Sequence, residues 1–325
     1  MNHPRKATKA IKPERLRRGD VVGIVTPASA PPDPRVIDYS VKTLRQLGFK
    51  PRLARNARKR HGFLAGSDAE RANDLMQMFA DDRVKAIFCI RGGYGTARLL
   101  PLLDYRYIRQ HPKILIGYSD ITTLHCALLK KANLISFHGP MLNAELAAGK
   151  LPAFTVNSLL RTVTQAAPAG SLRAGFRRKT IQVLRRGVVS GELVGGNAAV
   201  LCTTLGTPFQ PDFRRKILFL EDLDEKPYRY DRLLTHLLNA DVLQQVAGIA
   251  VGINVDCVDP KAKRSREYRQ TLEDVLRERL LPLNVPVVVG LPFGHQPWNA
   301  TLPVGVRARL DADNGDLIIT EAAVQ

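Results

Sequence analysis

The 325-residue sequence has no uninterrupted apolar run close to the roughly 18 residues that a membrane-spanning helix needs. Its basic first twenty residues are not followed by the apolar segment of a secretory signal peptide. Its four cysteines are widely scattered and lack the close spacing of zinc or redox motifs. We therefore expect a cytoplasmic protein without a membrane partner, with buried, reduced thiols.

Acidic residues are scarce relative to basic ones, with 30 Asp and Glu against 49 Lys and Arg and a net charge of +19. Such a charge attracts anionic polymers. The basic clusters, however, are not regularly interleaved with aromatic residues, of which they contain only Phe176 and Tyr268, and they contain no nucleic-acid-binding motif. They are Arg15–Arg18, Arg52–Arg60, Arg173–Lys179 and Lys261–Arg269. We interpret them as a solvated surface and do not expect a nucleic-acid partner.

Short apolar runs alternate with amphipathic segments from Asp20 onward, which predicts an α/β fold with a mainly parallel sheet. The expected strands are Val21–Val25, Pro51–Ala54, Ala86–Ile90 and Lys113–Gly117. The expected helices are Pro34–Leu47, a helix from the Ser67/Glu70 capping box to Ala80, and Ile121–Lys131.

We divide the chain into a basic N-terminal extension (1–19), a first domain (20–143), an interdomain connection of weak pattern (144–186) and a second domain (187–325). In the second domain, strands are expected at Ile217–Leu220, Ile249–Val251 and Val287–Val289, and helices at Tyr228–Asn239 and Glu267–Leu280. A hairpin of Val306–Leu310 and Leu317–Thr320 is predicted around Asp313-Asn-Gly315.

Ser119 follows the predicted strand Lys113–Gly117 and precedes a predicted helix. In this context a nucleophile elbow presents a serine at the end of a sheet. The G-x-S-x-G pattern is not met, because Ile121 stands where the second glycine would be. Taken alone, a serine in this place is more typical of a helix N-cap, so these residues leave both interpretations open.

A glycine-rich turn, Arg91-Gly-Gly-Tyr-Gly-Thr96, follows the predicted strand that ends at Ile90. Its glycines allow a ligand to approach the backbone N–H groups closely. It matches neither the Walker pattern nor G-x-G-x-x-G, so nucleotide phosphate is not specifically indicated. In a parallel sheet this turn and Ser119 both lie at carboxyl ends of strands, where such folds place their sites. We expect one loop to supply an oxyanion donor to the other.

Two side chains in the second half are candidates to complete a relay with that serine. Glu221 ends the apolar strand Ile217–Leu220, although it also fits a solvated acidic turn or a cation site. His295 lies in the loop Gly290-Leu-Pro-Phe-Gly-His295, and loops of this kind are where functional residues concentrate. His138, just after another apolar strand, is a further candidate to line the site.

Seven short motifs occur in one order between about Asp20 and Leu310. They are Gly19-Asp20 with Thr26-Pro-Ala-Ser29, Arg91-Gly-Gly-Tyr-Gly95, Gly117-Tyr-Ser-Asp120, His138-Gly-Pro140, Gly195-Gly-Asn197, Leu220-Glu-Asp222 and Gly290-Leu-Pro-Phe-Gly-His295. Each is unspecific alone, whereas seven in this order are highly specific. Together they resemble the LD-carboxypeptidase family of serine peptidases.

The resemblance implies a Rossmann-like N-terminal domain that carries the serine and a swivelling α/β C-terminal domain that carries the other two triad residues. Carried over residue by residue, it makes Ser119 the nucleophile, Glu221 the triad acid and His295 the base. The implied oxyanion donors are the backbone N–H groups of Asp120 and of Gly93, which we prefer to Gly92. No metal or organic cofactor is implied.

Family members typically release terminal D-alanine from murein tetrapeptide, so the resemblance predicts a muramoyltetrapeptide carboxypeptidase of peptidoglycan recycling. We expect it to be a homodimer with a small peptide substrate. The residues expected to bind that substrate are Gly92, Arg91, Tyr94 and His138. An exopeptidase must also bind the terminal carboxylate, for which Arg91 and Arg98 are the candidates.

Two alternatives stay open. A related branch of the family hydrolyses peptidyl-nucleotides of the microcin C type, which requires an aromatic side chain to stack on the base. The only tryptophan is Trp298, and the segment 144–186 offers only Phe154 and Phe176, which favours murein peptide. From a different class, a non-catalytic binding protein would use the Arg91 turn to hold a phosphate or sugar between its domains.

Overall fold

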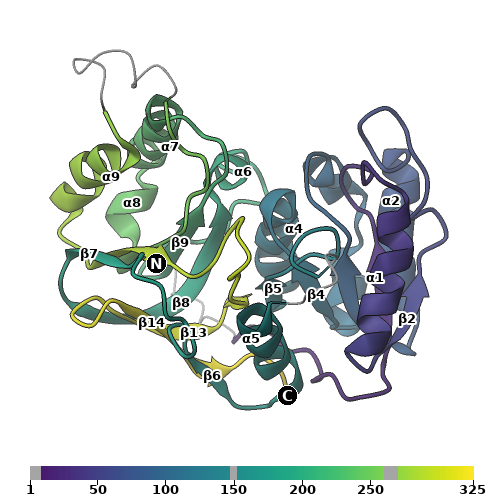
Figure 1. Cartoon of the computed structure of the whole chain (residues 1–325). Helices are drawn as coiled ribbons and strands as arrows, with labels where there is room; N and C mark the ends of the chain where they lie inside the picture. The colour runs from purple at the N-terminus through teal and green to yellow at the C-terminus, as the bar shows by residue number, and fades with distance from the viewer. Residues whose placement is uncertain (1–8, 147–151, 260–269) are drawn as a thin grey trace, which may run out of the picture.

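A computed structural model describes residues 9–146, 152–259 and 270–325. The chain forms two β-sheets with flanking helices, which lie side by side in Figure 1. Most of the first sheet comes from the first half of the chain and most of the second sheet from the second half. This arrangement confirms the predicted α/β fold class with a mostly parallel N-terminal sheet.

The first sheet contains, within the described residues, six strands in the order β12-β5-β4-β3-β1-β2. β1 to β5 pair in parallel, whereas β12 is antiparallel to β5. The strands are β1 (Val21–Val25), β2 (Lys50–Leu53), β3 (Val84–Cys89), β4 (Ile114–Gly117), β5 (Ser136–His138) and β12 (Leu302–Val304). The helices beside them are α1 (Arg35–Gln46), α2 (Asp68–Ala80), η1 (Thr96–Leu102), α3 (Tyr105–Gln110), η2 (Ser119–Ile121), α4 (Thr122–Ala127) and η3 (Leu128–Ala132).

The second sheet contains eight strands among the described residues, in the order β6-β14-β13-β8-β9-β10-β11-β7. The central strands β8 to β11 are parallel, and the outer pairings are antiparallel. The strands are β6 (Pro168–Ser171), β7 (Gln182–Arg185), β8 (Val188–Asn197), β9 (Ile217–Glu221), β10 (Gly248–Gly252), β11 (Val287–Leu291), β13 (Arg307–Asp311) and β14 (Asp316–Ala322). The helices are α5 (Ala153–Thr164), α6 (Ala198–Cys202), α7 (Pro227–Asn239), α8 (Val242–Gln245), α9 (Leu272–Leu280) and η6 (Leu281–Leu283).

Local sequence signals explain several of these boundaries. Ser67 Oγ accepts the N–H of Glu70 and Glu70 Oε2 accepts the N–H of Ser67, which confirms the predicted capping box at the start of α2. β13 and β14 form the predicted hairpin around Gly315, whose φ of +63° suits glycine. The predicted start of the last helix, Glu267, lies outside the described residues.

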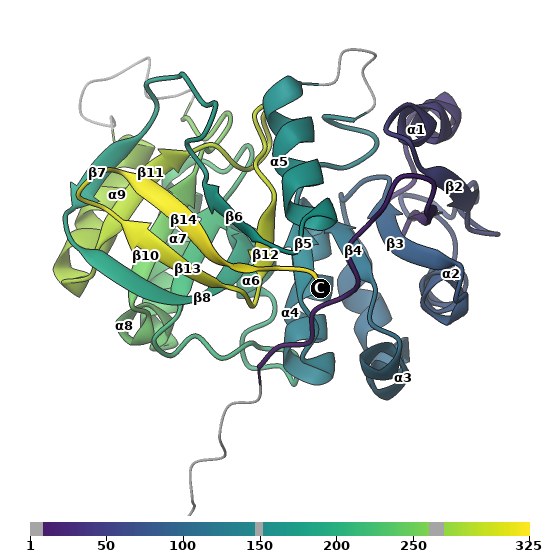
Figure 2. The same ribbon diagram turned by 90° about the horizontal axis from the view of Figure 1, so that it is seen from below.

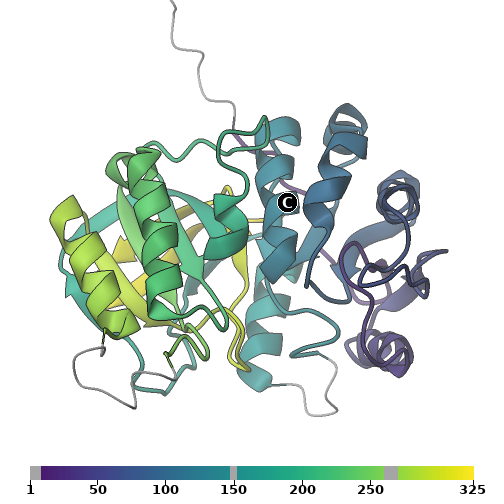
Figure 3. The same ribbon diagram turned by 90° about the horizontal axis from the view of Figure 1, so that it is seen from above.

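The two sheets share one hydrophobic core. Phe137 of β5, Phe219 of β9 and Leu302 of β12 belong to a single buried cluster that spans both halves of the molecule. Helices α7 and α9 cover the face of the second sheet that is seen from above in Figure 3, where a second apolar cluster forms. No helix in the described ranges is long and apolar enough to cross a membrane.

The segment 144–186, expected to connect two domains, contributes regular structure within its described part. α5 lies between the two sheets in Figure 2, while β6 and β7 add strands at the two edges of the second sheet. These strands were not predicted because Pro168–Ser171 and Gln182–Arg185 are short, largely unburied and without apolar alternation. β12 returns from the second half to pair with β5 of the first sheet. The domain boundaries stay a prediction.

The described part of the basic N-terminal extension, residues 9–19, packs along the body of the protein. The N–H of Ile11 donates to Asn133 O, and the N–H of Leu16 donates to Val163 O of α5. The Leu16 side chain is fully buried. This segment therefore helps to hold α5 and the first sheet together, which gives it a structural role.

Candidate active site

The turn after β4 holds Ser119 in a conformation that few residues other than glycine adopt. β4 ends at Gly117, where a Cβ atom would lie 2.9 Å from Ile121 Cγ1, so a larger residue does not fit the turn. Tyr118 is extended, and Ser119 then has a φ of +61°, in the left-handed region. This backbone conformation costs about 1–3 kcal/mol. A strained serine between a strand and a helix is the geometry of a nucleophile elbow.

The glycine-rich turn packs directly on this elbow. A Cβ atom on Gly92 would lie 3.0 Å from Ser119 Cβ and 3.1 Å from both Ser119 Oγ and the backbone N of Asp120. Gly93 has a φ of +98°, and a Cβ there would lie 2.6 Å from Ser29 Oγ. Glycine at position 92 thus allows the turn to approach the elbow closely, and glycine at position 93 leaves room for Ser29. Gly93 and Asp120, whose N–H groups are the predicted oxyanion donors, are the residues that directly follow Gly92 and Ser119.

Polar contacts fix the turn in this position. Asp120 Oδ2 accepts hydrogen bonds from the N–H and hydroxyl of Thr96, at 2.8 and 2.9 Å. On the other side, Ser29 Oγ accepts the N–H of Tyr94 at 3.1 Å. The buried guanidinium of Arg71 donates to Gly95 O at 3.0 Å. Hydrogen bonds therefore join the turn both to the elbow and to the loop after β1.

Glu221 and His295 are joined, although they come from different strands of the second sheet. Glu221 is the last residue of β9 and has no exposed surface. Its Oε2 lies 2.7 Å from Nδ1 of His295, in the loop after β11. Gly294 has a φ of +111°, and a Cβ there would lie 2.9 Å from Glu221 Oε2. The glycine before the histidine therefore makes room for the carboxylate.

The carboxylate controls the charge and tautomer of this histidine. Burial disfavours the imidazolium, but the hydrogen bond and negative charge of Glu221 outweigh burial and raise the pKa of His295 above its usual value. When Nδ1 carries the proton that is donated to Glu221, Nε2 of the neutral ring has a free lone pair. That nitrogen is then available to accept a proton.

The histidine loop meets the elbow at Tyr118, the residue before Ser119. The Tyr118 ring lies edge-on to the His295 ring, with centroids 4.7 Å apart and an interplanar angle of 67°. Among the described residues, no direct hydrogen bond joins Ser119 Oγ to His295. Catalytic hydrogen bonds are often long without substrate and tighten in the Michaelis complex. The structure thus brings the three predicted residues into one region and joins two of them.

A chain of polar contacts through Asn197, here called the Asn197 bridge, also links the two sheets beside the site. A Cβ on Gly196 would lie 2.4 Å from Thr122 Oγ1, so β8 approaches α4 closely. The N–H of Asn197 donates to Thr122 Oγ1 at 3.0 Å, and its side chain donates to Asp222 Oδ1 at 2.8 Å. The Gly195-Gly-Asn197 motif thus connects the helix after Ser119 to the residue after Glu221.

Two polar residues near the site were missed by the sequence analysis. Glu145 is buried and accepts hydrogen bonds from the Tyr118 hydroxyl and from Asn299. Asn299 Oδ1 in turn accepts the N–H of Gly294. Glu145 lies in the weakly patterned segment after β5, and a single carboxylate there is indistinguishable from a solvated one in the sequence.

The predicted substrate-binding residues lie in different environments. His138 is fully buried and its ring lies beside that of Tyr118, so it does not face solvent, and its substrate-binding role stays a prediction. Tyr94 is half exposed and contacts the exposed ring of Phe63. Arg98 is bound to Asp68 at 2.9 Å, whereas Arg91 donates to a backbone carbonyl, Ala30 O, at 3.2 Å and has no carboxylate partner in the described part of the chain. Burial lowers the pKa of Arg91.

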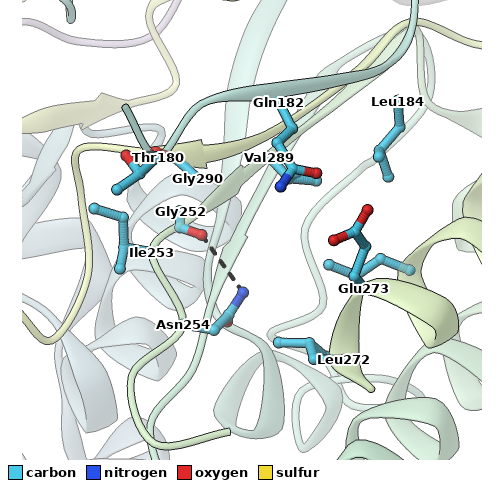
Figure 4. Close-up of a pocket in the computed structure, with 11 residues that line it drawn as sticks. Thr180, Gln182, Leu184, Gly252, Ile253, Asn254, Leu272, Glu273, Val289 and Gly290 are labelled. Carbon is cyan, nitrogen blue, oxygen red and sulfur yellow. Dashed lines mark hydrogen bonds between the residues drawn. The ribbon is translucent and has the colours of Figure 1, made fainter. Parts of the chain in front are cut away.

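A separate pocket of about 260 Å³ lies between strands β7, β10 and β11 of the second sheet and helix α9 (Figure 4). Its wall includes the Asn254 side chain, which Figure 4 shows hydrogen-bonded to Gly252 O. Asn254 Oδ1 also accepts the N–H of Asp222. The lining residues do not include Ser119, Glu221 or His295. In the described part of the chain, no three His, Cys, Asp or Glu side chains converge as metal ligands.

Comparison with known proteins decides the family. Residues 22–139 match the model of the LD-carboxypeptidase N-terminal domain, and residues 190–310 match that of the C-terminal domain. The chain belongs to the LD-carboxypeptidase family. It is a serine carboxypeptidase, which confirms the resemblance drawn from the seven motifs and argues against a non-catalytic binding protein.

Similar LD-carboxypeptidases cover nearly the whole chain. The probable murein peptide carboxypeptidase of Bacillus subtilis is 39% identical over 313 residues, covering 96% of this chain and 95% of its own. The solved muramoyltetrapeptide carboxypeptidase from Oxalobacter formigenes has a TM-score of 0.81 at 31% identity, covering 93% and 99% of the two chains. Microcin C7 self immunity protein MccF, in complex with aspartyl sulfamoyl adenosine, has a TM-score of 0.86 at 26% identity, covering 97% and 100%.

The left-handed conformation of Ser119 leads to a stability prediction. Ser119→Gly should have a free energy of unfolding about 1 kcal/mol higher than Ser119→Ala, because glycine adopts a positive φ without a Cβ clash. Urea denaturation of the two variants measures the difference. Ser40, buried inside α1, is the matched control, where glycine should be less stable than alanine. Equal stabilities of the Ser119 pair would contradict the strained turn.

Proposed function

We propose that this LD-carboxypeptidase releases terminal D-alanine from murein tetrapeptide through an acyl-enzyme, with Ser119 as nucleophile, His295 as base and Glu221 as the acid that orients it. The observation that carries the proposal is the 2.7 Å contact of Glu221 Oε2 with His295 Nδ1, next to a serine held at a φ of +61°. A nucleophile, a base and an orienting carboxylate are the elements of a serine hydrolase relay.

In the proposed mechanism, His295 Nε2 takes the proton of the Ser119 hydroxyl as Oγ attacks the carbonyl carbon of the bond to D-alanine. The negative charge that forms on the carbonyl oxygen is stabilised by the N–H groups of Asp120 and Gly93. One such donor contributes about 3–4 kcal/mol in comparable hydrolases. His295 then gives its proton to the leaving amino group, and water repeats the sequence on the ester. Glu221 stabilises the imidazolium in both steps.

Arg91 is the proposed anchor for the terminal carboxylate. Its Nη2 lies 3.3 Å from where a Cβ of Gly93 would be, so the guanidinium lies beside the proposed oxyanion donors. It is partly buried, and no ion-pair partner of its guanidinium occurs among the described residues, where it donates to Ala30 O. Arg98, by contrast, is paired with Asp68, a carboxylate that it shares with Arg71. A guanidinium and a carboxylate form a strong, often bidentate, hydrogen-bonded pair.

The aromatic side chains that we considered for stacking on a nucleobase already contact other side chains, which supports a murein peptide substrate over a peptidyl-nucleotide. The Arg178 guanidinium lies 3.5 Å from the centre of the Trp298 ring, and Phe154 packs on Phe176 with centroids 5.6 Å apart. A nucleobase would have to displace these contacts to stack. The likeness to MccF keeps peptidyl-nucleotide hydrolysis as the second candidate. A homodimer and a cytoplasmic location stay predictions.

Competition between the two substrates tests the proposal. We expect kcat/KM for D-alanine release from murein tetrapeptide to exceed that for a microcin C type analogue by at least about tenfold, or roughly 1.4 kcal/mol in transition-state binding. Both products are quantified from one reaction. Ser119→Ala is the control and should lose activity by a factor of about 10⁴ or more. A preference for the nucleotide would overturn the substrate assignment.

The raised pKa of His295 predicts the pH dependence. Because the base must be neutral, kcat/KM should fall as the pH drops through the His295 pKa, which Glu221 holds above the ordinary 6.5. Glu221→Gln removes the negative charge, so the fall should move to lower pH while the maximum rate decreases. Initial rates between about pH 5 and 9 give both profiles. A wild-type rate that is flat down to pH 5 would remove histidine from the chemistry.

The proposed carboxylate anchor predicts a change in substrate affinity. Arg91→Met should raise KM for tetrapeptide by about tenfold or more, because a charge-assisted hydrogen bond contributes about 1.5–3 kcal/mol. Arg98→Met is the matched control and should leave KM nearly unchanged, because the Arg98 guanidinium is already hydrogen-bonded to the Asp68 carboxylate. Wild-type enzyme should show the same loss with a tetrapeptide whose terminal carboxylate is amidated. Equal KM values for the acid and the amide would exclude such an anchor.

A further inference from the structure

The carboxylate of Glu145 occupies a buried position between the two halves of the candidate site. The residue follows β5 and is 8% exposed. Its Oε1 accepts a hydrogen bond from the Tyr118 hydroxyl at 2.9 Å and from Asn299 Nδ2 at 3.3 Å, while its Oε2 accepts the N–H of Met141 at 3.2 Å. Both oxygens are therefore used, and the donors come from three separate segments.

One of these contacts reaches the nucleophile. Tyr118 is buried and immediately precedes Ser119, whose φ of +61° depends on how the preceding residue is held. The hydroxyl bond to Glu145 fixes the far end of the tyrosine ring, and the ring edge contacts His295. Moving the Glu145 carboxylate would therefore move the Tyr118 ring against both the elbow and the histidine.

The other contact reaches the histidine. Asn299 is fully buried, donates to Glu145 and accepts the N–H of Gly294 at 3.2 Å. Gly294 is the residue before His295. The N–H of Asn299 donates to Thr155 Oγ1 of α5 at 2.9 Å, which anchors the loop from behind. Two hydrogen bonds thus connect the Glu145 carboxylate to the backbone of Gly294, the neighbour of the proposed base.

We propose that Glu145 is a positioning residue, which holds the Ser119 turn and the His295 loop in register through Tyr118 and Asn299. These three side chains are called the Glu145 bridge below. The proposal rests on the proposed roles of Ser119 and His295. It assigns a function to a carboxylate outside the triad, in a segment for which the sequence predicted only a connection.

Glu145 also acts on His295 through its charge. Among the described residues, the ionisable groups near the imidazole are Glu221, Asp222, Glu145, His138 and Tyr118, which contacts it through its ring. Burial lowers the pKa of His138 far below its usual value, so it is neutral, whereas the negative charges of Glu221, Asp222 and Glu145 all favour imidazolium. Burial raises the pKa of Glu145 itself, and the hydrogen bonds from Tyr118 and Met141 oppose this rise.

The test compares Glu145→Gln with wild type by two independent readouts. The first is kcat and KM for tetrapeptide. We expect kcat to fall about tenfold to a hundredfold, as a shift of about 1 Å between catalytic groups does, with KM nearly unchanged. The second is the pKa of His295 measured by NMR titration of its ring proton without substrate, which should decrease because one facing negative charge is lost.

Two further variants separate positioning from general destabilisation. Tyr118→Phe keeps the ring against His295 but removes the bond to Glu145, so it should lower kcat and leave KM nearly unchanged. Asp74→Asn is the matched control, because Asp74 is also a buried carboxylate bound to an asparagine, Asn56, but contacts no residue of the site. It should leave both kcat and the His295 pKa as in wild type.

The outcomes are distinct. Wild-type kcat and wild-type His295 pKa in Glu145→Gln would overturn the proposal, as would equal changes in Asp74→Asn. If Glu145→Gln does not fold, wild-type kcat in Tyr118→Phe overturns it instead. Should wild-type protein release no D-alanine, the proposed function fails, whereas the NMR titration still decides whether Glu145 acts on His295.

Discussion

Glu221 is fully buried, and a buried carboxylate needs a hydrogen-bond partner. The arrangement of much of the site depends on that partner, which is His295. Glu221 Oε2 is bound to His295, while its Oε1 is buried without a hydrogen-bond partner among the described residues. Breaking a buried pair of this kind typically costs about 3–5 kcal/mol. The histidine ring is therefore held in one orientation, and Gly294 is needed because a side chain there would displace the carboxylate.

The fold was predictable where a local signal is strong. Apolar runs located β1, β3, β4, β9, β10 and β11, the Ser67/Glu70 capping box located α2, and Asp313-Asn-Gly315 located the last hairpin. The sequence did not predict β6, β7, β8 or β12. Leu302–Val304 becomes a strand only because β5 lies beside it, although the two are far apart in the chain. Such pairings depend on tertiary contacts, which propensity does not encode.

The candidate site was located by motif order more than by physical derivation. From the residues alone, Ser119 was more typical of an N-cap than of a nucleophile, and nothing in Gly117-Tyr-Ser-Asp120 specifies a positive φ. Glu221 and His295 are far apart in the sequence, so only the parallel order β9-β10-β11 brings their loops together. The burial of His138 and the position of Glu145 depend on how the two sheets pack, and a single sequence contains no direct measure of that packing.

Two polar bridges make this packing specific. The Asn197 bridge joins Thr122, after Ser119, to Asp222, after Glu221. The Glu145 bridge joins Tyr118, before Ser119, to Asn299 and through it to Gly294, before His295. The nucleophile is thus flanked on both sides in the chain by residues tied to the second sheet. Hydrophobic contact alone tolerates sliding, whereas buried hydrogen bonds are lost when either partner shifts. The strain at Ser119 persists because these directional contacts surround it.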